Sequence, residues 1–174
     1  MADYIVRPVS MIDESPGLVT RGARVKIASG ADFIANNLVK VANGEASTIT
    51  TGDNAGLAFV EEPAINKAYV AEGTDYDNTK TEVEVRFIGG KRIAMTLTGT
   101  YTSASIGAEV GVALDASGYA VADASQANKI GIVEGVYGNQ ILQSGNNAFL
   151  QDNVKDNDTN VYVIVRVYDA VALG

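Results

Sequence analysis

Short runs of alternating apolar and polar residues recur along this chain, separated by glycines. One run, TEVEVRF at 81–87, alternates valine and phenylalanine with glutamate and arginine, and KRIAMTL at 91–97 spaces its large apolar residues in the same way. A period of two is the pattern of a strand with one buried face. Because the runs are short and bounded by turn-forming residues, we predict an all-β fold, a compact barrel or sandwich of short strands.

Gly89-Gly90 joins these two runs, so a hairpin is one possible connection. A two-residue loop would place the large apolar side chains of the second run on the same face as Glu84 and Arg86. We therefore expect either an odd loop, Ile88-Gly89-Gly90 with Gly90 at positive φ, or two strands that are not direct partners.

The last run, NVYVIVRVYD at 160–169, carries valines on one face and a mostly apolar set on the other. Both faces therefore favour burial, and we predict a central or sandwiched strand. Helical patterns are weak: AINKAYVAEG at 64–73 allows a turn or two, and DASQANK at 123–129 a single turn. We expect little helix.

Three segments of the first half resemble three of the second half, in the same order. The pairs are 21–29 with 106–114, 55–62 with 130–135, and 81–87 with 159–167. One interpretation is an internally duplicated β unit, with pseudo-repeats at 17–100 and 101–174 inside one β-rich domain, 17–174. The alternative is that all strands draw on the same few residue types.

The segment 107–135, GAEVGVALDASGYAVADASQANKIGIVEG, predicts a strand, a turn, a second strand, a polar link and a third strand. Asp115 opens the turn because its carboxylate can accept a backbone N–H two residues on. Gly118 closes the turn, where positive φ is expected.

This order, an Asp-x-x-Gly turn followed by alanine-rich sequence and Gly-Ile-Val, resembles the capsid decoration, or cement, proteins of tailed bacteriophages. A weaker version lies at 22–61. The resemblance implies a β-rich protein on the outer capsid surface of the virion, made in the cytoplasm of the host bacterium. It implies the major capsid protein as partner, clamping of neighbouring capsomers, and a homo-oligomer, with a trimer favoured over a dimer. It brings no catalytic residues and no cofactor.

Composition narrows the chemistry further. The 174 residues include no histidine, cysteine or tryptophan, so the commonest general base and the commonest transition-metal ligand are missing. Asp156, Asp158 and Asn160 have calcium-loop spacing, but valines stand at the sixth and twelfth positions, so we expect a solvated turn. We predict no enzyme activity, no cofactor and no metal; an enzyme that uses carboxylates alone is the weakest alternative.

The net charge of −8 argues against nucleic acid as a partner. The N-terminus carries acids and lacks the apolar run of a signal peptide, so we expect none. No stretch approaches 18 continuous apolar residues, and we expect no membrane span.

Residues 1–16 show no periodic pattern, and we interpret them as an extended N-terminal arm that orders against a neighbouring subunit. Candidate contacts with the capsid or a second copy are Arg7, Pro8, Met11 and Ile12. The alternative is a strand added to the protein's own sheet.

A basic cluster, Arg21, Arg24 and Lys26, could dock on an acidic partner surface. The alternative is a solvated strand face. A carbohydrate-binding or adhesin-like module is the alternative function: the eight tyrosines favour it, and the absence of tryptophan opposes it.

Overall fold

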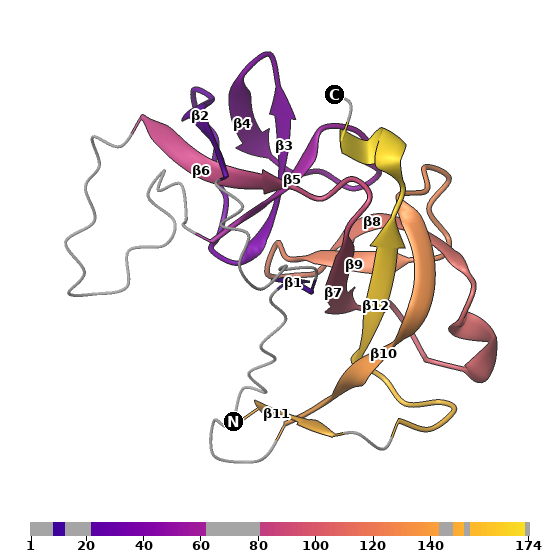
Figure 1. Cartoon of the computed structure of the whole chain (residues 1–174). Helices are drawn as coiled ribbons and strands as arrows, with labels where there is room; N and C mark the ends of the chain where they lie inside the picture. Colours follow the sequence, from indigo (N-terminus) through magenta and orange to yellow (C-terminus); the bar gives the residue numbers. More distant parts are fainter. Residues whose placement is uncertain (1–8, 13–21, 62–80, 143–147, 152–153, 173–174) are drawn as a thin grey trace, which may run out of the picture.

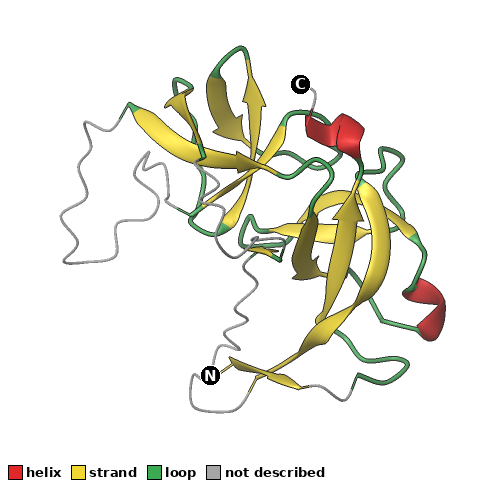
Figure 2. Cartoon of the chain, viewed as in Figure 1, coloured by secondary structure: helices red, strands yellow, loops and turns green. Residues whose placement is uncertain are grey.

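The computed structural model describes residues 9–12, 22–61, 81–142, 148–151 and 154–172 (Figure 1). About 51% of these residues lie in strands and about 5% in helix, which confirms the predicted all-β class (Figure 2). The helical residues form two short 3₁₀ segments that the sequence did not predict, η1 (Ser103–Ser105) and η2 (Asp169–Ala172). The segment 123–129, where the sequence allowed one helical turn, begins at the end of a strand and continues as turns and bends. No helix in the described ranges is long and apolar enough to span a membrane.

The first half of the chain forms a closed five-stranded barrel. Its strands are β2 (Ala23–Ile27), β3 (Asn37–Ala42), β4 (Glu45–Thr48), β5 (Leu57–Val60) and β6 (Glu82–Phe87). They follow the order β2-β4-β3-β5-β6 and close back onto β2. Every pair is antiparallel except β2 with β4. Small side chains, mostly valine and alanine, fill the interior.

The second half forms a curled sheet. Its strands are β7 (Arg92–Thr96), β8 (Glu109–Leu114), β9 (Ala120–Asp123), β10 (Gly131–Leu142), β11 (Ala148–Gln151) and β12 (Val161–Val167), with β1 (Ser10–Met11) added from the N-terminus. The order is β1-β7-β12-β10-β8-β9, and β11 pairs with β10. A parallel bridge between Leu97 and Ala122 brings the end of β7 back to β9, so the sheet curls into a half-barrel.

The two units share one topology. If the strands of each unit are numbered one to five, β2 to β6 in the first and β7, β8, β9, β10 and β12 in the second, both follow the order 1-3-2-4-5. In both, the parallel contact joins strands one and three.

This order makes β5 the counterpart of β10, and β6 the counterpart of β12. Two of the three sequence matches, 55–62 with 130–135 and 81–87 with 159–167, pair the same strands. The third match pairs β2 with β8, whereas the strand order pairs β2 with β7. The units also divide between β6 and β7 instead of at residue 100. The duplication itself stays a hypothesis.

The predicted strands 81–87 and 91–97 are present as β6 and β7, but they belong to different units and do not pair. A tight turn connects them, in which Lys91 N donates to Ile88 O at 3.0 Å and Gly90 has φ +71°. The second of our two alternatives is therefore correct, and the predicted positive φ at Gly90 is also confirmed.

The core of the second unit includes residues of the first. All four residues of β5 are buried: Ala58 and Val60 point into the first barrel, while Leu57 and Phe59 join the core of the second unit. The alternate valines of β12 line that same core. As predicted, β12 is central, between β7 and β10.

The structure corrects the interpretation of residues 9–12 as part of an arm. β1 pairs antiparallel with β7, Val9 N donates to Asn36 O at 2.9 Å, and Ile12 N donates to Arg92 O at 3.1 Å. Val9 is 1% exposed, and Met11 packs against the core. Apolar burial and backbone pairing hold this segment on its own sheet, which is the alternative that the sequence left open. The remainder of the predicted arm lies outside the described residues.

Candidate interaction surface

The longest strand, β10, breaks the period-two rule with the repeat Val-Glu-Gly-Val-Tyr-Gly at 133–138. Its pairing with β12 shifts twice, so that Glu134 and Tyr137 have no opposite residue in the register. Each is the extra residue of a β-bulge, which bends a strand and re-aims a side chain. The neighbouring glycines lie opposite large side chains: Gly135 opposite Ile164, and Gly138 opposite Tyr162.

Both bulged side chains point away from the core and contact β12. Glu134 accepts a hydrogen bond from Arg166 Nε at 2.9 Å. The ring of Tyr137 packs against the ring of Tyr162, with centroids 6.1 Å apart and planes tilted by 51°. A tilted pair at this distance is a favourable aromatic arrangement. Tyr162 is buried, whereas Tyr137 is 47% exposed.

Among the residues whose exposure the structure describes, three large apolar side chains are exposed, and each lies on this strand or in the segment next to it. Tyr137 and Ile132, which is 37% exposed, lie on β10 itself. Ile106, 42% exposed, lies beside the strand, because Gly107 N donates to Val133 O at 2.7 Å. We call these three residues the apolar stripe. Exposed apolar side chains at one side of a molecule are candidates for a contact surface.

Charged residues rim the stripe. Ile132 stands in a cross-strand row between Glu109 on β8 and Arg166 on β12. Tyr168 donates a hydrogen bond from its hydroxyl to Glu109, and this bond raises the pKa of the phenol above its ordinary value. The rim therefore carries both signs of charge, as the edge of a protein–protein contact does.

The basic residues of β2 lie on the first barrel, where acids surround them. Lys26 stands opposite Glu82 on β6 and Glu45 on β4, and Arg24 lies 3.5 Å from Glu82. The arginine and glutamate side chains are 71% and 50% exposed. This is a strand face with alternating charges, and its exposed pairs contribute little to stability.

The candidate contact residues are thus distributed over two units. Met11 and Ile12 lie on the second sheet, and Arg24 and Lys26 on the first barrel. Arg7, Pro8 and Arg21 lie outside the described residues.

The calcium-like sequence forms a turn. Asp158 accepts a hydrogen bond from Lys155 N at 2.8 Å, and Asp156 accepts one from Ser103 N at 2.9 Å. These carboxylates are occupied by backbone donors, as in other Asx-rich turns. Nowhere in the described ranges do three or more potential metal ligands of the Asp, Glu, His or Cys type cluster.

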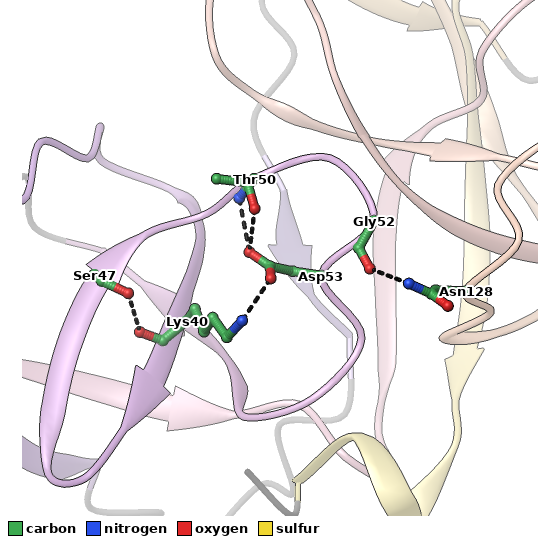
Figure 3. A network of polar contacts seen from close by, with 6 residues as sticks. All are labelled: Lys40, Ser47, Thr50, Gly52, Asp53 and Asn128. Atoms are coloured by element: carbon green, nitrogen blue, oxygen red, sulfur yellow. Dashed lines mark hydrogen bonds and ion pairs between the residues drawn. The ribbon is translucent and has the colours of Figure 1, made fainter.

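A polar network joins the two units (Figure 3). Gly52, in the loop after β4, donates its N–H to Val112 O and accepts from the side-chain amide of Asn128, both at 2.9 Å. Asp53 holds this loop in shape, because it accepts from Lys40 Nζ at 2.7 Å and from Thr50 N at 2.8 Å. Burial raises the pKa of Asp53, but the hydrogen bonds from Lys40 and Thr50 outweigh it, and the pKa lies below its usual range.

Sequence reasoning missed the apolar stripe. For Tyr137 the signal was the period-three repeat at 133–138, because glycine in the interior of a strand often marks a bulge. No protein-family model, curated protein or solved structure matches this chain in the comparisons with known proteins.

Proposed function

We propose that this protein is a structural component of a virion that binds the outer surface of a phage capsid and clamps neighbouring capsomers. The observation that supports the proposal is the apolar stripe on and beside β10, which is a candidate contact surface. The segment that resembles decoration proteins, 107–135, supplies β8, β9 and the start of β10, and so lies at this surface.

The mechanism is contact without reaction. Burial of Ile106, Ile132 and Tyr137 against the capsid would add apolar area across a capsomer boundary, and separation of the capsomers would have to expose it again. Many copies, each of modest affinity, give a large total on a repetitive shell. Self-association on the shell, as a trimer or a dimer, belongs to the same proposal.

Co-sedimentation with undecorated capsids, assembled from the cognate major capsid protein, tests this function. We expect the wild-type chain to saturate the capsids, and Ile132→Asp with Tyr137→Ser to weaken binding tenfold or more, because aromatic anchors dominate protein contacts. Ala42→Asp is the matched control, since it adds the same charge at an exposed hairpin position of the first barrel. Absence of wild-type binding, or equal binding by the double variant, refutes the proposal.

The alternative is a carbohydrate-binding module, and the Tyr137–Tyr162 pair is the observation in its favour. A half-exposed tyrosine ring offers an apolar face and a hydroxyl group to a sugar. A glycan array separates the two functions: binding that Tyr137→Ser abolishes, together with no capsid binding, would establish the alternative.

A further inference from the structure

A cavity of about 260 Å³ lies where the two units meet. Apolar residues from both units line it: Phe33, Ile34 and Ile49 from the first half of the chain, and Leu114 from β8. Ligand pockets for drug-sized molecules start at about 300 Å³. The volume therefore suits a smaller guest, such as one long side chain.

The cavity is preformed. The side chain of Asn37, only 2% exposed, donates to Gly118 O at 2.9 Å and accepts from Ala120 N at 2.8 Å, so it ties the β8–β9 turn to the first barrel. Two further lining residues are tied together, because Asp32 N donates to Thr48 Oγ1 and the Thr48 hydroxyl donates to Asp32 O, both at 2.8 Å. A guest would therefore meet walls that are already ordered, which lowers the entropic cost of binding.

One charge lines the cavity, and it is negative. Asp32 is the sole ionisable residue of the lining. Its backbone is fixed by Thr48, and its carboxylate has no hydrogen-bond or ion-pair partner among the described residues. Asp115, next to Leu114 in the sequence, directs its carboxylate to Ser117 N and Tyr119 N in its own turn. A carboxylate beside apolar walls favours a guest with an aliphatic stem and a terminal cation.

We propose that this cavity receives a single lysine or arginine side chain from a protein partner. The stem would pack between Phe33 and Leu114, and the cation would pair with Asp32. The net charge of −8 adds long-range attraction for a basic partner segment. This proposal goes beyond the capsid proposal and does not depend on it.

Small-molecule probes test it on the full chain. n-Butylammonium represents lysine, n-butylguanidinium represents arginine, and n-butanol carries the same stem without charge. We expect saturable NMR shifts at the amides of Phe33, Ile34 and Gly118 with millimolar affinity for one or both cations. n-Butanol should bind at least tenfold more weakly.

Asp32→Asn should weaken cation binding about tenfold and leave n-butanol binding unchanged. Asp169→Asn, at an exposed position of η2, is the matched control and should bind as wild type. Thermal unfolding of both variants establishes that they are folded. Shifts that do not saturate, n-butanol that binds as tightly as the cations, or an Asp32→Asn variant that still binds them as wild type would overturn the proposal. No capsid enters the experiment, so its failure and the failure of the capsid proposal are separate results.

Discussion

The first barrel and the second unit have the same strand order and the same pairing directions, but they close differently. In the first, two residue pairs, Lys26 with Glu45 and Ile27 with Ala46, complete the parallel contact. In the second, the single pair Leu97 with Ala122 does so. The first barrel encloses its own core of small side chains, whereas the core of the second includes Leu57 and Phe59 of the first.

The difference shows that topology and closure have separate causes. Strand order follows from connection lengths and pairing, and both units satisfy it. Closure goes with the make-up of the core: mostly valine and alanine fill the closed first barrel, whereas residues from the first half complete the core of the half-open second unit. The two bulges in β10 add curvature, but they also direct Glu134 and Tyr137 outward.

The shared core should give the largest mutational effect. Phe59→Ala removes a side chain that is 5% exposed from the contact between the units, and we expect a loss of about 3–5 kcal/mol in the free energy of unfolding. Urea denaturation measures it. Val60→Ala, inside the first barrel, is the comparison and should cost less, since it removes less volume. A Phe59→Ala loss no larger than that of Val60→Ala would mean that the units do not share a core.

β1 tests whether the second unit needs its N-terminal strand. Deletion of residues 1–12 removes the burial of Val9 and its hydrogen bond to Asn36, and we expect about 2–4 kcal/mol of destabilisation. Deletion of residues 1–8 keeps these contacts and is the control. Thermal unfolding of the two truncations should separate them by several degrees. Equal unfolding temperatures for the two truncations would mean that residues 9–12 do not stabilise the sheet and form part of a free arm.

Glycines of β10 probe the packing of the second unit. A Cβ on Gly131 would lie 2.2 Å from Arg166 O, a backbone atom, whereas one on Gly135 would lie 3.9 Å from Ile164 Cδ1. We expect Gly131→Ala to cost about 1–3 kcal/mol through overpacking. Gly135→Ala should change stability by less than about 1 kcal/mol, because its contact is ordinary packing. Chemical denaturation measures the free energy of unfolding of both variants. A larger loss for Gly135→Ala than for Gly131→Ala would refute the pairing register of β10 with β12.

A substitution of Asp53 should give the smallest change in stability of the four, and the size of this change should depend on pH. Asp53→Asn removes the charge that pairs with Lys40, for a loss of roughly 1 kcal/mol at neutral pH. Because the pKa of Asp53 is lowered in the folded state, its contribution is complete above the unfolded pKa of about 3.9. It is lost as the pH falls through the folded value. The difference between wild type and variant should therefore shrink in acid, and a constant difference from pH 7 to pH 2 would contradict this assignment.

The sequence predicted fold class and most strands well, because period-two patterns report directly on burial. The turn at 115–118 is also confirmed: Asp115 accepts from Ser117 N, and Gly118 has φ +85°. Partners were harder to predict. In the structure Ile93 pairs with residues of β1 and β12. The sequence around Ile93 fits equally well with pairing across the Gly89-Gly90 turn, so it does not show which strands are its partners.

The candidate surface was predicted less well. Met11 was expected to be an exposed anchor, but its neighbour Val9 inserts into the core and places it on a sheet edge. Arg24 was expected in a basic patch, but Glu82 and Glu84 of β6 lie beside it. Both cases have one cause: the neighbours of a surface residue depend on strand pairing, which a single sequence specifies weakly.

The shared core also has a consequence for synthesis on the ribosome. The first barrel has all its strands once β6 has emerged, yet Leu57 and Phe59 belong to a core that is completed only by β12, which is made about 75 residues later. Contacts between distant parts of a chain form slowly, and exposed apolar surface on a partly made protein invites aggregation. The nascent chain therefore carries a first barrel with an uncovered apolar side until β12 has been made. Chaperone demand should be greatest in that interval.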